Sequence, residues 1–201
     1  MTAKLLPLYN TNGQSTCPMG MAMNQNRLAV PTWSYAMEIA PPVRVVELGT
    51  NNAGMTTALA LHCKMIGARL ITYDTGFPDE RIGPVALLLG VEFRRADIWA
   101  TEREIAALIT APGRVFLLCD GGDKQRELAM FAQYVKPGDV IATHDYDAIH
   151  EIDPGVPQLE RYWPWGECTQ AMARPIAEAW GLEPFLQDHF DMAGWLAWTK
   201  P

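Results

Sequence analysis

Between residues 43 and 145 of this 201-residue chain, five short apolar segments alternate with four segments of helical periodicity. The first of them, VRVVEL, is short, β-branched and apolar, as expected for a strand buried in a parallel sheet. The predicted strands cover residues 43–48, 69–73, 91–95, 114–119 and 139–143, and the helices fall within 56–66, 84–89, 101–109 and 125–135. Such an alternation predicts an α/β fold: a Rossmann-like, doubly wound, mostly parallel sheet with helices on both faces.

The C-terminal part departs from this alternation. A helix is expected over residues 172–180, followed by two strand-like segments at 182–187 and 194–199. The connection between these segments, DHFDMA, is too short for a crossover between parallel strands, so the two are predicted to pair antiparallel. The sheet then has seven strands, with an antiparallel C-terminal hairpin at one edge.

The N-terminal part is less regular. A helix is expected over residues 33–39, and it ends before Pro41 because proline disfavours helical backbone in the residue that precedes it. The whole chain, residues 1–201, is predicted to be one domain. Residues 1–32 are predicted to be an irregular extension of it or a lid; disorder or a contact in a homo-oligomer are open alternatives.

Composition limits the partners. The formal net charge is −7, and an acidic surface opposes binding to the phosphate backbone of nucleic acids. No apolar run reaches the roughly 18 residues that a membrane helix needs. The N-terminal stretch MTAKLLPLYNTNGQSTCPMG lacks the apolar core of a signal peptide. A cytoplasmic protein with neither nucleic-acid nor membrane partners is expected, its four cysteines reduced and mostly buried.

An acidic residue stands at the carboxyl end of each of the five predicted strands. Ligands of doubly wound sheets bind outside the carboxyl ends of the strands. A single Asp there has a simpler explanation, because Asp is common in loops. Five in succession favour a binding site; they are Glu47, Asp74, Asp97, Asp120 and Asp145.

The loop GTNNAG, from Gly49 to Gly54, follows the first predicted strand. Glycines allow close approach of backbone to a ligand, and the N-terminus of the next helix offers free N–H groups to an anion. The loop lacks the middle glycine of the dinucleotide fingerprint, which favours a carboxylate-bearing ligand without a pyrophosphate. Asp74 lies where an acid would accept hydrogen bonds from two ribose hydroxyls. A nucleoside with an amino acid tail, S-adenosylmethionine, fits both features.

The motifs ELGTNNAG, ITYDTG, ADIW and VFLLCDGG occur here in the order seen in class I S-adenosylmethionine-dependent methyltransferases. The resemblance covers residues 33–200 and includes the predicted terminal hairpin. It implies that Asp97 and Ile98 flank the adenine of the cofactor. The full set of cofactor-binding residues that it implies is Glu47, Gly49, Gly54, Asp74, Asp97, Ile98 and Asp120.

A narrower resemblance links the segment DGGDKQRELAMFAQYVKPGDVIATHDY to a group of small-molecule and sugar methyltransferases. Cephalosporin-hydroxylase-like and macrocin-type O-methyltransferases belong to this group, whose pattern is DG-x-H, PGG and HDY. The chain departs from the pattern twice. Asp123 stands at the position of the expected His, and Asp139 replaces the second Gly of PGG.

The resemblance implies that Asp120 and the pair His144-Asp145 face the transferred methyl group. Related O-methyltransferases hold a divalent metal with acids at these positions. All three residues are therefore predicted ligands of Mg²⁺, with Asp120 and His144 as catalytic residues and His144 as an alternative general base. A cation would also relieve the repulsion between two carboxylates. The simpler alternative is that Asp120 only contacts the cofactor and His144 bonds to backbone. Lys124 is expected to be a solvated surface residue, the alternative being a second base if burial lowers its pKa.

The sequence thus predicts an S-adenosylmethionine-dependent methyltransferase, acting on a hydroxyl of a small-molecule or sugar acceptor. Two alternatives stay open: a nicotinamide-dependent oxidoreductase on a similar sheet, and a non-catalytic module that binds nucleosides. Trp163 and Trp165, in the stretch RYWPWGECTQ, either cover the acceptor pocket or pack against the edge of the sheet.

Overall fold

The computed structural model describes residues 15–16, 22–76, 82–146, 148 and 166–201. Trp163 and Trp165 lie outside the described residues, as do residues 1–14 and 17–21 of the predicted N-terminal lid. Two short strands of that segment, β1 (Ser15–Thr16) and β2 (Ala22–Met23), pair antiparallel in a small sheet of their own.

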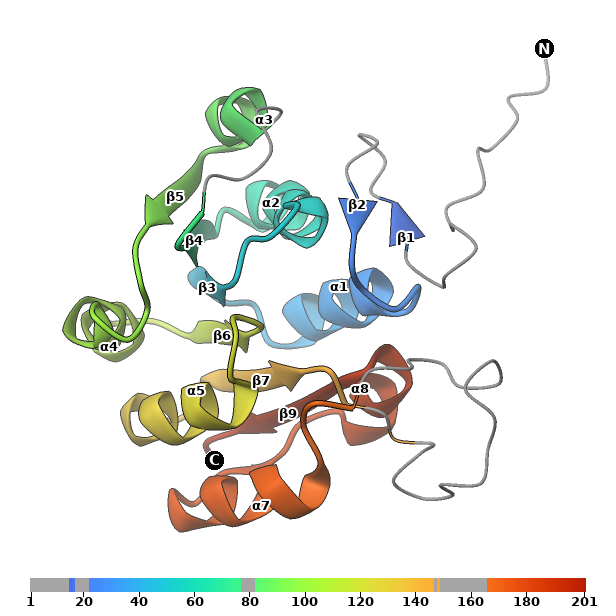
Figure 1. The fold of residues 1–201 in the computed structure, drawn as a ribbon, viewed down its shortest axis with the longest axis vertical. Coiled ribbons are helices and arrows are strands. Elements are labelled where there is room, and N and C mark those ends of the chain that lie inside the picture. Colours follow the sequence, from blue (N-terminus) through green and yellow to red (C-terminus); the bar gives the residue numbers. More distant parts are fainter. Residues whose placement is uncertain (1–14, 17–21, 77–81, 147, 149–165) are drawn as a thin grey trace.

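A seven-stranded sheet forms the centre of the described structure, in the order β5-β4-β3-β6-β7-β9-β8 (Figure 1). The first five strands of this order are parallel, and β9 runs antiparallel to both β7 and β8. The strands are β3 (Arg44–Leu48), β4 (Arg69–Asp74), β5 (Val91–Arg95), β6 (Val115–Cys119), β7 (Val140–His144), β8 (Glu183–Pro184) and β9 (Trp195–Thr199). The predicted fold class, including the antiparallel edge, is confirmed.

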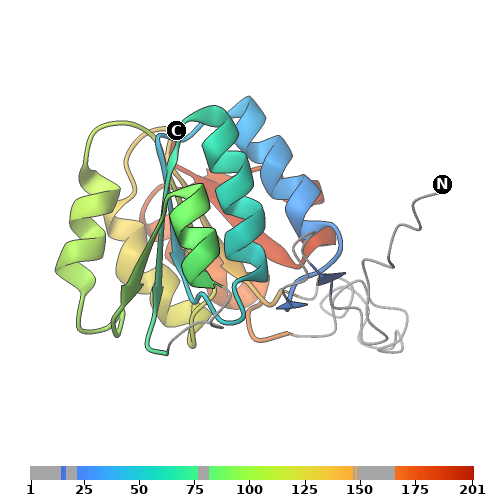
Figure 2. The same ribbon diagram turned by 90° about the horizontal axis from the view of Figure 1, so that it is seen from above.

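Helices cover both faces of this sheet (Figures 1 and 2). One face carries α1 (Ala29–Ile39), α2 (Gly54–Ile66), α3 (Ile82–Leu89) and α8 (Gln187–Ala193); the other carries α4 (Glu102–Thr110), α5 (Lys124–Phe131), the short 3₁₀ helix η1 (Ala132–Tyr134) and α7 (Gln170–Ala179). Neighbouring strand residues such as Val45 and Val46 pack into opposite cores, because successive side chains of a strand point to opposite faces. None of the described helices is long and apolar enough to cross a membrane.

The connection between the two C-terminal strands is a helix. The segment 182–187 was expected to be a strand, but only Glu183–Pro184 is one, since Leu186 adopts a left-handed conformation with φ of 48°. The residues DHFDMA then belong to α8, whose buried Phe190 and Ala193 are three positions apart and face the core. The antiparallel pairing is therefore as predicted, while the strand expected over residues 182–187 is shorter and is followed by a helix.

Helix α1 begins at Ala29, four residues before the predicted start, so the end of the 1–32 segment is helical. The helix is anchored by Trp33, whose ring makes edge-on contacts with Phe190 at 4.9 Å and with Trp195 at 5.2 Å between ring centroids. The N-terminal helix and the C-terminal strand thereby belong to one core. Gln25, among the described residues just before this helix, lies beside His144 at the carboxyl end of β7.

Both departures from the small-molecule methyltransferase pattern have structural roles. Asp123 is the N-cap of α5, where its side chain accepts a hydrogen bond from the backbone N–H of Arg126 at 2.9 Å. Asp139 is buried and accepts from the backbone N–H of Val115 at 2.8 Å and from Lys136 Nζ at 2.7 Å. Asp139 therefore ties the start of β6 to the turn that precedes β7.

Replacing Asp139 by Ala should lower the free energy of unfolding by about 2–4 kcal/mol, because the N–H of Val115 and the ammonium of Lys136 lose their acceptor. Urea denaturation followed by circular dichroism measures this difference. The matched control is Glu178→Ala on the exposed side of α7, which should change stability by no more than about 0.5 kcal/mol. If both substitutions change the free energy of unfolding equally, Asp139 does not stabilise the contact between β6 and the turn before β7.

Candidate active site

The loop between β3 and α2 passes against the backbone that follows β6. Gly49 has a φ of +94°, and a Cβ atom at this position would lie 2.1 Å from the carbonyl oxygen of Asp120. Only glycine fits such an approach. Asn51 and Ala53 also have positive φ values, of 45° and 59°, a conformation that costs a non-glycine residue about 1–3 kcal/mol. The loop is therefore held in a shape that local sequence preference does not favour.

A cavity of about 430 Å³ opens at the carboxyl ends of β4 and β5, and we call it the β4–β5 cavity. It is lined by Gly49, Asn51, Tyr73, Asp74, Thr75, Ala96, Asp97, Ile98, Trp99, Asp120, Gly121 and Gly122. The cavity thus includes Asp74, Asp97 and Ile98, which the sequence assigned to the nucleoside. The Asp74 carboxylate accepts from the backbone N–H groups of Asn51 at 2.8 Å and Gly76 at 2.9 Å. A carboxylate offers about four acceptor positions, so capacity remains for two hydroxyl groups.

A second cavity, of about 300 Å³, lies at the carboxyl ends of β6 and β7, and we call it the acidic cavity. Its lining residues are Met23, Asn24, Gln25, Gly49, Thr50, Asn51, Asn52, Ala53, Gly54, Met55, Asp120, Gly121, Lys124, His144, Asp145 and Glu167. The two cavities share Gly49, Asn51, Asp120 and Gly121. An elongated ligand that rests on the loop therefore reaches both of them, with Asp120 at the junction.

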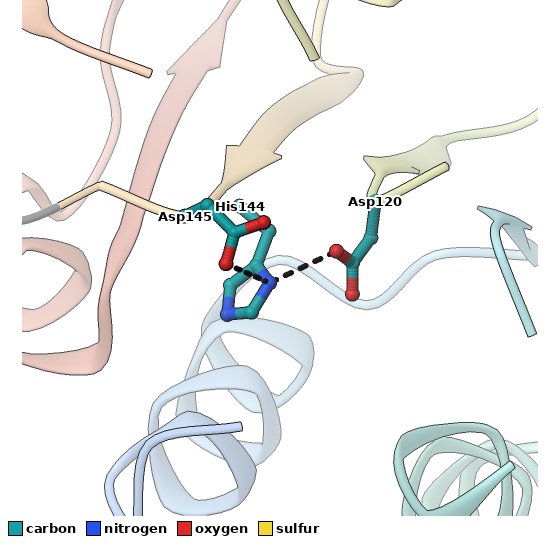
Figure 3. A group of neighbouring side chains, drawn as sticks. All are labelled: Asp120, His144 and Asp145. Atoms are coloured by element: carbon teal, nitrogen blue, oxygen red, sulfur yellow. Dashed lines mark hydrogen bonds and ion pairs between the residues drawn. The ribbon is translucent and has the colours of Figure 1, made fainter. Parts of the chain in front are cut away.

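Three predicted residues converge in the acidic cavity, and we call them the acidic cluster: Asp120, His144 and Asp145 (Figure 3). The Nδ1 atom of His144 lies 2.9 Å from Oδ1 of Asp120 and 3.2 Å from Oδ1 of Asp145. Because Nδ1 faces two carboxylate oxygens, we assign its proton to this nitrogen. The ring is buried and packs on Trp195, with 4.6 Å between ring centroids. The imidazole is thus held in position by two carboxylates and an indole ring.

Lys124, the first residue of α5, is also part of the acidic cavity. Its Nζ atom lies 2.8 Å from Oδ2 of Asp145 and 3.0 Å from Oε2 of Glu167, and its side chain is only 8% exposed. Burial alone would lower the pKa of Lys124, but the neighbouring Asp145 carboxylate outweighs this effect and raises the pKa above its usual value. The expected solvated surface lysine was wrong: Lys124 is a buried, charged partner of the cluster.

Gln25, from the N-terminal segment, also contacts the cluster. Its Oε1 atom accepts from the indole N–H of Trp195 at 3.0 Å, which turns its amide nitrogen toward Asp120 Oδ2, at 2.7 Å. Sequence reasoning missed this residue. It lies 95 positions before Asp120, and no local pattern distinguishes it from the other amides of an Asn- and Gln-rich stretch.

Glu47 lines neither cavity. Its carboxyl group is buried beneath the loop and accepts from the hydroxyl of Thr56 at 2.6 Å. Burial is the main cause that raises its pKa from 4.5 to about 8, so the group is largely protonated at neutral pH. In this structure Glu47 supports the start of α2 from below.

Glu127 binds the backbone that follows Asp120, where the two cavities meet. Sequence reasoning missed this residue as well. Its carboxylate accepts from the backbone N–H groups of Gly121 at 3.2 Å and Gly122 at 2.9 Å. A Cβ atom at Gly121 would lie 2.5 Å from Glu127 Oε1, so the DGGD segment fits closely around this side chain. Glu127 is the only Glu of α5 and lies on its buried side, and a buried acid on a helix was the one sequence signal of its role.

No protein-family model matches the chain, and no curated protein matches its sequence. Solved structures do share its fold. An apo structure of CmcI-N160 aligns with a TM-score of 0.63 at 14% identity, covering 96% of this chain and 79% of CmcI. A structure of CmcI-D160 with Mg and S-adenosylmethionine aligns with a TM-score of 0.59 at 13% identity, covering 89% and 74%.

Two further solved structures share the fold of this chain. The methyltransferase PaMTH1 of Podospora anserina, bound to S-adenosylhomocysteine, has a TM-score of 0.52 at 13% identity, covering 84% of this chain and 76% of its own. NcsB1, an O-methyltransferase from neocarzinostatin biosynthesis, has a TM-score of 0.51 at 14% identity, covering 86% and 57%. The chain therefore has the fold of S-adenosylmethionine-dependent methyltransferases, as the sequence motifs predicted.

The raised pKa of Glu47 predicts a pH-dependent stability. The folded state keeps the proton of Glu47 up to about pH 8, whereas the unfolded state releases it near 4.5, so the contribution of this group to stability falls as pH rises between these values. Glu47→Gln, which cannot ionise, removes this fall. Relative to the variant, the wild type should lose free energy of unfolding from pH 5 to pH 8 in urea denaturation.

The control for this prediction is Glu38→Gln on the exposed side of α1, whose stability should run parallel to that of the wild type over the same pH range. If the Glu47→Gln curve is also parallel to the wild type, the carboxyl group is ionised in the folded protein and the assignment is wrong.

Proposed function

We propose that this protein transfers a methyl group from S-adenosylmethionine to a hydroxyl of a small-molecule or sugar acceptor. The observation that carries the proposal is the junction of the two cavities at Asp120, beside the Gly49–Gly54 loop. The nucleoside of the cofactor fits the β4–β5 cavity, with Asp74 accepting from the ribose. The methionine part then lies along the loop, and the transferred methyl points toward the acidic cluster.

The geometry of the acidic cluster suits the removal of a proton from an acceptor. Methyl transfer forms a bond from the acceptor oxygen to the methyl carbon and breaks the bond from that carbon to sulfur, so the hydroxyl proton must leave. Asp120 is the most exposed member of the cluster, with a side chain 19% exposed against 2% for His144. In this proposal Asp120 faces the acceptor hydroxyl and accepts its proton, and His144, which donates from Nδ1 to Asp120, orients the carboxylate for this transfer.

The polar lining of the acidic cavity supports a hydroxyl-rich acceptor. Besides the cluster it contains the amides of Asn24, Gln25, Asn51 and Asn52. Amides offer both donors and acceptors, which match the two roles of a sugar hydroxyl. The structures of similar fold support the chemistry at a coarser level, because CmcI is described with S-adenosylmethionine and NcsB1 as an O-methyltransferase.

The predicted Mg²⁺ ligands also fit a metal in their donor chemistry. Asp120, His144 and Asp145 each offer one ligand atom, and these atoms lie within 4.8 Å of one another. The two carboxylates are oxygen donors of the kind that Mg²⁺ and Mn²⁺ prefer, and His144 would join them only through a nitrogen that carries no proton. A bound cation would supply charge that lowers the pKa of the acceptor hydroxyl.

Asp74→Ala should weaken S-adenosylmethionine binding by about 1.5–3 kcal/mol, because hydrogen bonds to a charged group are lost. Isothermal titration calorimetry measures the affinity. Asp188→Ala removes the same charge from the exposed start of α8 and should leave the affinity unchanged. A folded Asp74→Ala variant with wild-type affinity would remove Asp74 from the cofactor site. Binding of a nicotinamide dinucleotide in place of S-adenosylmethionine would favour the oxidoreductase.

His144→Gln should lower the rate of S-adenosylhomocysteine release by about 10²–10⁴-fold, the contribution of a positioned acid or base. The assay uses a panel of sugar and phenolic acceptors, and cofactor affinity is measured beside it. His189→Gln on α8 is the matched control, since His189 is exposed and outside both cavities. If the His144→Gln variant turns over at the wild-type rate, His144 has no role in the reaction and the carboxylates alone remove the proton.

A further inference from the structure

The outer oxygens of the acidic cluster are already occupied by groups of this chain. Lys124 Nζ lies 2.8 Å from Oδ2 of Asp145, and Gln25 Nε2 donates to Oδ2 of Asp120 at 2.7 Å. The inner oxygens, Oδ1 of both acids, face His144 Nδ1. The two carboxylates are thus held close together by protein groups, which removes the repulsion that alone would call for a metal.

Lys124 is an unusual residue for its position. It is the first residue of α5, and the N-terminus of a helix carries a partial positive charge that disfavours a cation. The side chain is nevertheless buried and charged, and Asp145 and Glu167 compensate for both costs. Among the described residues that line the acidic cavity, it is the only Lys or Arg. Its place is explained by the cluster and not by the helix.

We propose that Lys124 is the resident cation of the acidic cluster and sets how tightly the cluster binds a divalent metal. While Lys124 pairs with Asp145, its ammonium neutralises one carboxylate and repels a second cation. Without it, the carboxylates of Asp120 and Asp145 together attract a divalent ion. The inference deepens the proposed function, because it names the cation that accompanies the carboxylate pair during methyl transfer.

The test is the affinity for Mn²⁺, a paramagnetic ion with the ligand preference of Mg²⁺, measured on the full chain without cofactor or acceptor by electron paramagnetic resonance. Lys124→Met should bind Mn²⁺ at least about tenfold more tightly than the wild type, equivalent to about 1.4 kcal/mol. Lys124→Arg keeps the charge and should retain the weaker wild-type affinity. Adding Asp145→Asn to Lys124→Met should abolish the gain.

The matched control is Lys136→Met, which removes a lysine from another Lys–Asp pair, that with Asp139, and should leave Mn²⁺ affinity unchanged. Circular dichroism verifies folding; should Lys124→Met fail to fold, Lys124→Gln takes its place as a neutral polar variant. Equal or weaker Mn²⁺ binding by the folded neutral variant, or no detectable binding by either protein, overturns the proposal. Failure of S-adenosylmethionine to bind would instead overturn the proposed function, since the Mn²⁺ titration uses no cofactor.

Discussion

The site depends on one close contact, the passage of Gly49 against the carbonyl group of Asp120. A methyl group at Gly49 would overlap this carbonyl at 2.1 Å, so the loop after β3 and the backbone after β6 meet only because a glycine stands there. The contact makes Asp120 the shared wall of the two cavities. It lies where the winding of the sheet reverses, with β4 on one side of β3 and β6 on the other, which is where such sheets bind ligands.

The acids at the strand ends have different surroundings, and these give them different tasks. Glu47 is buried beneath the loop, where burial raises its pKa to about 8 and keeps it mostly neutral. Asp74 accepts backbone N–H groups at the edge of the β4–β5 cavity. Asp120 and Asp145 share His144 between them. One sequence pattern thus yields a structural acid, a proposed ribose acceptor and a proposed catalytic cluster.

The sequence predicted the features that follow from periodicity and strand order. Segments rich in β-branched residues, with helical segments between them, predict the parallel sheet. Parallel strands bring their carboxyl ends to one edge, so the proximity of Asp120 and His144 was foreseeable. Contacts between segments that are distant in the sequence were not foreseeable. Gln25 reaches Asp120, and Lys124 reaches Asp145, through tertiary packing that no local spacing encodes. The same applies to α8. Its segment was expected to be a short connection between two strands, and its helical form depends on the packing of Phe190 against Trp33.

The central claim is transfer of a methyl group from sulfur to an acceptor oxygen beside Asp120. Its most direct test is incubation of the wild-type protein with S-adenosylmethionine that carries a ¹³C-labelled methyl group and a panel of hydroxyl-bearing acceptors, followed by mass spectrometry. The account predicts a labelled methyl ether on at least one acceptor, formed together with an equal amount of S-adenosylhomocysteine. Binding of the cofactor with no labelled product from any acceptor would contradict it and favour a non-catalytic module.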